Sequence, residues 1–353
     1  MISFPPEVNI NKDACDDDND EEWEEWEHQD ALFLVLFSNC FFNDSCRKPK
    51  WIHDRIVWEI HVQGLRHAGK FKQNYRMSER AFKKLLSMLY PRLHKNEVLS
   101  SNSTSGLGEV ISPEMIMALD LCLLAGASYI DLTSAYGVSE SSVFAARNSF
   151  VDVVNSCEEL KIVFPDSQKE INKLQNGFQA KSTHGLIRGC VGCIDRLLIE
   201  IKCPSKKECG NAPYLYCSRH YCCYGLNIQA VCDASMHFIF FSVAAPGRLS
   251  DQAALEETSH HTIISQFPLG LYIIGDAAYT VSDQMLVPFT GSSCQHPSKD
   301  AYNCFLSQMQ IQIKMSFGLL TNTWQVCGTH LLCSLPLCTN VDIKCTSFYF
   351  LYV

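Results

Sequence analysis

The sequence has no apolar run long enough to cross a membrane. Residues 31–37 form an apolar run of only seven residues, which Ser38 and Asn39 end, whereas a transmembrane helix needs about 18 or more. Residues 1–6 also lack the basic stretch followed by an apolar run that marks a secretory signal. These absences exclude a membrane protein and predict a chain of the nucleus or the cytoplasm that is not secreted.

Regular cysteine spacing is also missing, although cysteine is abundant. The 19 cysteines are odd in number and irregularly placed, which predicts free thiols in a reducing compartment. Cys190 and Cys193 form a close CxxC pair, but no second pair follows at the spacing of a zinc site. Because the pair lies in an apolar run, we interpret it as two buried strand cysteines. A cysteine-rich metal-binding protein is the alternative that the missing second pair disfavours.

Basic residues are almost absent from the N-terminal segment. Residues 1–44 contain thirteen acids and one base, Lys12, whereas residues 45–353 carry 28 basic and 25 acidic side chains. The net charge of −9 therefore does not disfavour a nucleic acid as a partner of the remaining chain. We expect residues 1–50 to be a disordered acidic arm, since this composition offers little apolar surface to bury. A partner-binding or DNA-mimicking tail anchored by Trp23 and Trp26 is the alternative.

Helical periodicity dominates residues 51–184. One helix is predicted to start after Ser78, to end at Pro91 and to bury four apolar residues, Phe82, Leu85, Leu86 and Leu89. A polar loop follows at residues 100–108. Ser112 and Pro113 then predict the cap and the first residue of a second helix. A chain of 353 residues is long enough for two domains, and this helical region is predicted to be the first.

The segment 114–154 has the spacing of a helix-turn-helix unit. A short helix at residues 128–135 is followed by a turn at Gly137 and by a longer helix that starts at Ser139. As a DNA-reading element, the second helix would present Ser139, Ser142 and Arg147, which offer few basic groups for phosphate contacts. An ordinary three-helix bundle fits the spacing equally well.

After Gly185 the periodicity changes to that of strands. Strands are predicted at residues 189–201, 226–232, 237–244 and 270–274, with a helix at 251–259 before the last of them. Three strands, a helix and a further strand are the beginning of a ribonuclease-H-like α/β layer. The second domain is therefore predicted at residues 185–326, with a helix from about Asp300 near its end.

Carboxylates fall where such a layer gathers metal ligands. Asp195 lies in the first apolar strand, and Asp276 follows the strand after the helix, on strands expected to be adjacent. Burial of an unpaired carboxylate is costly, so Asp195 needs a cation or hydrogen bonds. Asp251, at the start of the helix, is a third candidate, with a helix-terminal charge as its alternative role. Hard Mg²⁺ or Mn²⁺ prefers such oxygen ligands, and nucleases of the two-metal type use them.

Ordered motifs connect these positions. They are residues 189–195 (GCVGCID), 224–233 (YGLNIQAVCD), 245–247 (APG) with Ser250 and Asp251 after them, and 274–279 (IGDAAY). Together with residues 299–303 and 317–319, they resemble the PIF/Harbinger superfamily of DDE transposases and its domesticated derivatives. The resemblance implies a ribonuclease-H-like fold, a divalent metal, and DNA strand cleavage and transfer. It assigns Asp195 and Asp276 as catalytic acids that also bind metal, and Asp251 as a further metal ligand.

The chain departs from that pattern around the same site. Lys314 stands where the resemblance expects the last catalytic glutamate, Gln310 replaces an arginine, and Arg196 replaces the usual glycine. Residues 327–353 form a cysteine-rich tail in place of a basic helical continuation. We therefore predict a transposase-derived DDE endonuclease that acts on DNA with impaired strand cleavage. The alternative is a non-catalytic DNA- or protein-binding module on the same fold, as an oligomer or with a partner protein that recognises DNA in trans.

Overall fold

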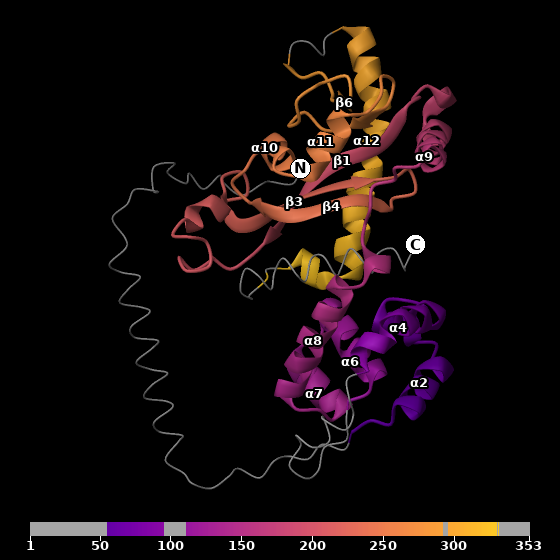
Figure 1. The fold of residues 1–353 in the computed structure, drawn as a ribbon, viewed down its shortest axis with the longest axis vertical. Coiled ribbons are helices and arrows are strands. Elements are labelled where there is room, and N and C mark those ends of the chain that lie inside the picture. The colour runs from indigo at the N-terminus through magenta and orange to yellow at the C-terminus, as the bar shows by residue number, and fades with distance from the viewer. Residues whose placement is uncertain (1–54, 95–110, 292–295, 330, 332–353) are drawn as a thin grey trace, which may run out of the picture. The chain divides into compact units, whose positions relative to one another are not determined.

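The structure, a computed structural model, describes residues 55–94, 111–291, 296–329 and 331. Within these residues the chain forms a run of helices followed by a mixed β-sheet with further helices (Figure 1). The predicted acidic arm, the polar loop at residues 100–108 and most of the cysteine-rich tail lie outside the described residues. The described part has the α/β class that the sequence predicts.

Serine caps begin most helices of the first half. These helices are α2 (Trp58–His67), α3 (Phe71–Tyr75), α4 (Glu79–Leu93), α6 (Pro113–Leu124), α7 (Tyr129–Tyr136), α8 (Glu140–Asn155) and α9 (Gln168–Lys181). Before all but α2 and α3, a serine hydroxyl accepts a hydrogen bond from a backbone N–H of the first turn, a contact that stabilises a helix by about 1 kcal/mol. The predicted starts at Ser78, Ser112 and Ser139 are confirmed, and Gly137 ends α7 in the left-handed conformation.

The predicted end of α4 at Pro91 is wrong, because the helix continues to Leu93. Proline removes one backbone hydrogen bond, but here it stands in the last turn, and the His94 N–H still donates to the Tyr90 carbonyl. Leu93 is 2% exposed. Its burial in the helical core therefore holds the last turn in helical form.

The sheet contains strand pairs of both orientations. Its strands are β1 (Cys190–Glu200), β2 (Cys217–Ser218), β3 (Cys223–Cys232), β4 (Phe238–Pro246), β5 (Tyr272–Ile274) and β6 (Met285–Leu286). β3 pairs antiparallel with β1, β2 and β4, whereas β5 pairs parallel with β1 and β6. β1 is therefore a central strand with an antiparallel and a parallel neighbour. Short 3₁₀ segments are η1 (Glu158–Leu160), η2 (Thr183–Gly185), η3 (Pro213–Tyr216) and η5 (Gln325–Gly328).

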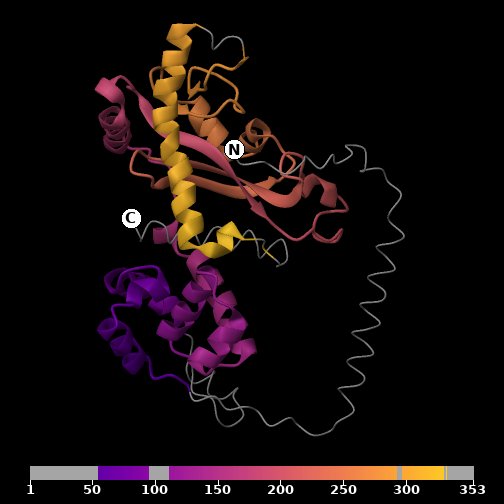
Figure 2. The same cartoon turned by 180° about the vertical axis from the view of Figure 1, so that it is seen from behind.

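Helices cover both faces of the sheet. α10 (Asp251–Glu256) and α11 (Ser259–Ser265) lie on one face, and the long α12 (Pro297–Thr323) crosses the other (Figures 1 and 2). In β1, Ile194 joins the apolar cluster that contains Leu255 of α10, whereas the Cys193 thiol donates to the Met309 carbonyl of α12. The predicted apolar face of α12 is confirmed, since its members Leu306, Met309, Ile313, Phe317 and Leu320 are buried.

The close cysteine pair belongs to the core of this sheet. Cys190 and Cys193 are both 0% exposed in β1, so their interpretation as buried strand cysteines is confirmed. The twelve cysteines of the described residues are all free thiols. The burial of Cys190 and Cys193 in β1 explains their spacing in an apolar run without a metal.

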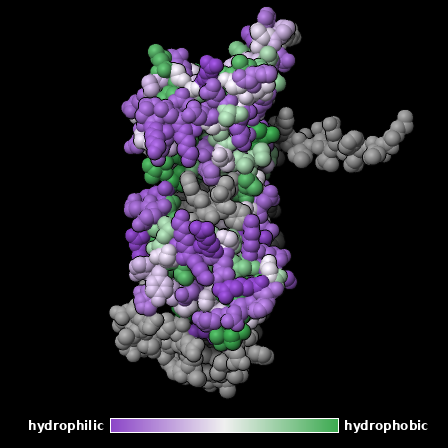
Figure 3. Space-filling view, turned by 90° about the vertical axis from the view of Figure 1, so that its right-hand side faces the viewer, coloured by the Kyte–Doolittle hydropathy of each residue, from purple (hydrophilic) through white to green (hydrophobic). Residues whose placement is uncertain are grey.

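Polar side chains dominate the surface seen in Figure 3, where hydrophobic groups are small and scattered. Apolar side chains exposed singly in this way are normal for a folded protein. Among the described helices, none is long and apolar enough to cross a membrane. The face shown therefore offers no broad apolar patch.

Gly189 and Gly270 give a matched test of how β1 is held beside β5. Their φ angles are +84° and +93°, a region where alanine costs about 1–2 kcal/mol. A Cβ at Gly189 would also collide with the Gly270 carbonyl oxygen, whereas a Cβ at Gly270 meets no described atom within 4 Å. Gly189→Ala should therefore lower the free energy of unfolding by at least about 1 kcal/mol more than Gly270→Ala, measured by urea denaturation. Equal losses of unfolding free energy in the two variants would contradict the close approach of Gly189 to the Gly270 carbonyl oxygen.

Candidate active site

The two predicted catalytic acids lie on neighbouring strands at the same level. In the parallel pair of β1 and β5, Cys193 stands opposite Ile274, and Asp195 and Asp276 each follow two residues later. Strands of one sheet lie about 4.8 Å apart, so this register brings the two carboxylates together at the end of β5. The predicted adjacency of these strands is confirmed.

Asp195 is half-buried, and its surroundings raise the pKa of its carboxyl to about 6. Burial is the main cause, and the Asp276 carboxylate adds to it. The Arg196 backbone N–H donates to Asp195 Oδ1 at 2.8 Å and, together with the Lys314 ammonium, acts against the rise. A carboxyl so placed holds its negative charge only where hydrogen bonds or cations support it.

The pleat of β1 sends neighbouring side chains to opposite faces of the sheet. Asp195 follows Cys193 by two residues and so shares the α12 face, where Lys314 interacts with its charge. Arg196 points to the α10 face, where its Nη1 lies 2.9 Å from Asp251 Oδ1. β1 therefore separates Asp251 from Asp195, although the two carboxylates remain within electrostatic range.

Asp251 ends a chain of buried hydrogen bonds on the α10 face. Tyr279 Oη donates to Gln229 Oε1 at 2.6 Å. Gln229 Nε2 donates to Asn227 Oδ1 at 2.8 Å, and Asn227 Nδ2 makes a longer contact of 3.5 Å with Asp251 Oδ1. Asn227 and Gln229 are 0% and 1% exposed. Because a buried polar group is costly unless paired, this chain stabilises the burial of all four side chains.

The Arg196 guanidinium is the cation of this buried group. Burial raises the pKa of Asp251, whereas Arg196 and the hydrogen bond from Asn227 act to lower it. The Arg196 and Asp251 side chains are only 19% and 6% exposed. The guanidinium also lies 5.5 Å from the centre of the Tyr221 ring. Arg196 is therefore fixed between a carboxylate and an aromatic ring.

Lys314 provides a second cation from α12. Its side chain is exposed, and its charge acts on Asp195. The helix contains one acid, Asp300 in its first turn, and Gln310, one turn before the lysine, is uncharged and half-buried. α12 therefore presents a positive charge to the strand acids, and its middle contains no carboxylate.

These residues do not fit a divalent-metal site. A hard divalent ion needs several oxygen ligands that approach it together, yet Arg196 engages Asp251 on one face of the sheet, and Asp195 lies on the other, where the charge of Lys314 acts on it. Among the described residues, no three acidic, histidine or cysteine side chains group closely enough to hold a metal ion. Of the predicted metal ligands, Asp251 and Asp195 therefore lie on opposite faces of β1.

Three polar side chains of the site, Asn227, Gln229 and Tyr279, were not predicted from the sequence. A signal was present for the first two, because they stand two residues apart in an otherwise apolar strand and must share one face. Tyr279 gave no such signal, since its contact with Gln229 joins residues 50 apart in the chain. Only the fold of the chain brings these three side chains together beside the Asp251 carboxylate.

The three side chains predicted to contact DNA lie on or beside α8 and have partners within the chain. Ser139 caps the helix, and its hydroxyl accepts from the Ser142 N–H and lies 2.8 Å from the Ser142 hydroxyl. The Arg147 guanidinium lies 5.1 Å from the centre of the Phe144 ring. Local contacts therefore account for the positions of these side chains.

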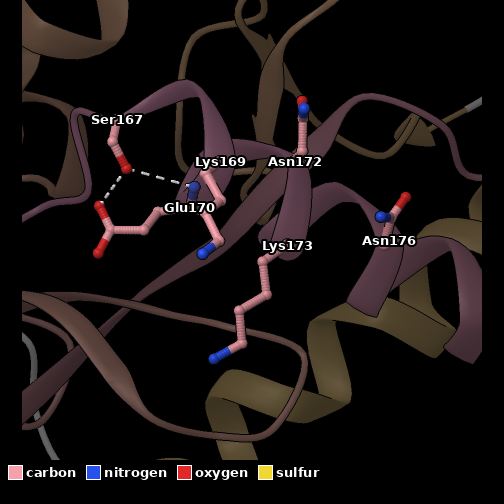
Figure 4. Close-up of a pocket in the computed structure, with 6 residues that line it drawn as sticks. All are labelled: Ser167, Lys169, Glu170, Asn172, Lys173 and Asn176. Atoms are coloured by element: carbon pink, nitrogen blue, oxygen red, sulfur yellow. Dashed lines mark hydrogen bonds between the residues drawn. The ribbon is translucent and has the colours of Figure 1, made fainter.

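A separate hollow lies along α9 (Figure 4). Its lining residues are Ser167, Lys169, Glu170, Asn172, Lys173 and Asn176, and none of them is a predicted site residue. Ser167 Oγ donates to the Glu170 carboxylate at 2.6 Å and accepts from the Glu170 N–H, so Ser167 is the N-cap of α9. The hollow is therefore a surface feature of one helix and its cap.

Part of the chain matches the model of a nuclease family. Residues 194–345 match the family described as DDE superfamily endonuclease. The matched range contains Asp195, Asp251 and Asp276, and it runs beyond residue 327 into the segment predicted as a cysteine-rich tail. No solved structure is significantly similar to the chain.

Relatives in a plant and an animal support the same assignment. The protein named Antagonist of Like Heterochromatin Protein 1 from Arabidopsis thaliana is 23% identical over 277 residues, which cover 72% of this chain and 65% of the relative. Putative nuclease HARBI1 from Rattus norvegicus is 25% identical over 185 residues, which cover 50% of this chain and 49% of the relative. The chain thus spans about half to two thirds of the length of these relatives. The resemblance to Harbinger transposase-derived nucleases is therefore confirmed.

Tyr279→Phe tests the buried hydrogen-bond chain. The change leaves Gln229 Oε1 buried without its donor, so the free energy of unfolding should fall by about 1–3 kcal/mol. Tyr214→Phe is the matched control, because Tyr214 is 56% exposed and its change should stay within about 0.5 kcal/mol. Chemical denaturation measures both variants. A loss in Tyr279→Phe no greater than in the control would show that the chain of bonds adds no stability.

Proposed function

We propose that the chain is a transposase-derived DDE nuclease fold that no longer cleaves DNA strands. The sheet order β4-β3-β1-β5-β6, with antiparallel pairs on one side of β1 and parallel pairs on the other, supports a ribonuclease-H-like layer within residues 185–326. In this proposal residues 51–184 form a separate helical domain, with a helix-turn-helix-like segment at 114–154, and residues 327–353 form a tail.

The position of Lys314 is the observation that supports the loss of cleavage best. Two-metal cleavage needs carboxylates around the ions, and α12 offers an ammonium near Asp195 where the last acid is expected. An ammonium at this place repels the ions that a carboxylate would attract, which disfavours cleavage.

Nicking of supercoiled plasmid DNA in Mg²⁺ or Mn²⁺ tests this loss. We expect no nicking by the wild-type chain above the Asp195→Ala background. Lys314→Glu supplies a carboxylate and should raise nicking at least about 100-fold above that background, whereas Lys314→Gln, which only removes the charge, should not. Wild-type nicking that disappears in Asp195→Ala would contradict the proposed loss. No gain in Lys314→Glu would show that Lys314 is not the only lesion.

A nucleic-acid-binding module on the same fold is the second candidate, and the segment between β1 and β3 favours it. Residues 201–224 carry four basic side chains and one acid. The basic residues are all exposed: Lys202, Lys206, Lys207 and Arg219. Tyr214 and Tyr221 in the same segment are 56% and 53% exposed. Basic side chains interleaved with exposed rings can contact a phosphate backbone and stack on bases.

The salt dependence of DNA binding tests this module. Lys206→Glu/Lys207→Glu should weaken the binding of a single-stranded oligonucleotide, and it should lower the slope of log K against log salt concentration by about 1.4 if both lysines contact phosphates. Lys169→Glu/Lys173→Glu, an equal charge change on the exposed side of α9, should leave the slope unchanged. Fluorescence anisotropy measures both. Equal slopes in the two variants would exclude this segment as the binding surface.

The contacts of α8 give little support for recognition of a particular DNA sequence by this chain. Ser139 and Ser142 are engaged in the cap of α8, and Arg147 lies over an aromatic ring. We therefore propose that a partner protein supplies DNA recognition in trans, and that the chain acts in the nucleus or the cytoplasm.

A further inference from the structure

Two basic side chains stand within the carboxylate site, one on each face of the sheet. Arg196 pairs with Asp251 at 2.9 Å on the α10 face. Lys314 lies on α12, which covers the face of β1 that carries Cys193 and Asp195, and its charge acts to lower the pKa of the Asp195 carboxyl. Both occupy positions where the chain departs from the motif pattern of the family. Arg196 and Lys314 thus lie on opposite faces of the sheet, Arg196 on the face of Asp251 and Lys314 on the face of Asp195.

On the basis of the proposed loss of cleavage, we propose that Arg196 and Lys314 are resident counter-ions of this site. They offset two of its three carboxylate charges from within the chain, so that the fold assembles and remains stable without a divalent ion. A site that contains its own cations has no need of the ions that strand cleavage uses. The loss of metal binding and the loss of cleavage therefore have one electrostatic cause.

The Arg196 contact has the features of a fixed ion pair. Its two side chains are 19% and 6% exposed, and Asp251 Oδ1 also receives the contact from Asn227. Gln229 and Tyr279 in turn hold Asn227 in place. An ion that took Asp251 as a ligand would have to leave the guanidinium unpaired in a mostly buried position, which is strongly unfavourable.

Lys314 acts differently, because its side chain is exposed and flexible. The parallel register of β1 and β5 brings Asp195 and Asp276 to one level, and two neighbouring carboxylates repel each other. The positive charge of Lys314, which acts on Asp195, offsets part of this repulsion. Removal of the lysine should therefore expose a pair of carboxylates that lacks a cation.

Thermal unfolding of the full chain in EDTA and in Mn²⁺ tests the replacement of metal. Wild type should unfold at the same temperature in both. Arg196→Gly/Lys314→Glu should have a lower Tm in EDTA and should gain about 5 °C or more in saturating Mn²⁺. Lys314→Glu alone changes only an exposed residue and keeps the test available if the double variant does not fold. Lys299→Glu, an equal charge change in the first turn of α12, should not respond to Mn²⁺.

A double-mutant cycle tests the ion pair itself. Arg196→Gln leaves the Asp251 carboxylate buried without its cation, so its Tm should fall by about 5 °C or more. Arg196→Gln/Asp251→Asn makes both partners neutral and should recover most of that loss. Additive losses in the cycle would overturn the counter-ion role of Arg196.

The comparison of Tm in EDTA and Mn²⁺ and the nicking assay test different claims, so either claim can be contradicted while the other stands. A rise in the wild-type Tm with Mn²⁺ equal to that of Arg196→Gly/Lys314→Glu would overturn the resident counter-ions, even if wild type does not nick DNA. No response of Lys314→Glu or of the double variant to Mn²⁺ would also overturn them. Wild-type nicking in Mg²⁺ would instead contradict the proposed loss of cleavage.

Discussion

The alternation of side chains along β1 is the constraint on which the carboxylate site depends. Asp195 and Arg196 are neighbours in the chain, and the pleat sends them to opposite faces of the sheet. Asp195 therefore faces α12, where the charge of Lys314 acts on it, whereas Arg196 reaches Asp251 at the start of α10. A one-residue slip of β1 against β3 or β5 would exchange these roles. The antiparallel register with β3 and the parallel register with β5 prevent such a slip.

Two cations of the chain stand beside the three carboxylates of the site. Asp195, Asp251 and Asp276 lie within residues 194–345, which match the family described as DDE superfamily endonuclease, and the two cations are the Arg196 guanidinium and the Lys314 ammonium. On the α10 face, Tyr279, Gln229 and Asn227 extend the Arg196 ion pair into a buried polar chain. Such groups are stable in a sheet interior because each has a partner. The α10 face of the site thus has the composition of a buried ion pair that hydrogen bonds extend.

Local signals in the sequence were sufficient for much of this fold. Serine caps predicted the starts of α4, α6 and α8, and the strands of the sheet follow apolar runs that are visible in the sequence. The end of α4 was not predictable, because the burial of Leu93 outweighs the local effect of Pro91. The two-residue strands β2 and β6 gave no periodicity to detect.

The candidate site was predictable to a smaller extent. The adjacency of Asp195 and Asp276 follows from strand order, and Lys314 was visible as a substitution. The pairing of Arg196 with Asp251 was not predicted, because it joins residues far apart in the chain across the face of the sheet. The division of the ligand set by β1 likewise required the register of the folded strands.

A crystal structure of the wild-type chain grown with Mn²⁺ tests the central claim most directly. If Arg196 and Lys314 are resident counter-ions, no anomalous manganese signal should appear beside Asp195 and Asp276. The contact between Arg196 and Asp251 should remain intact. A manganese ion within coordination distance of Asp195, with Arg196 turned away from Asp251, would contradict the account.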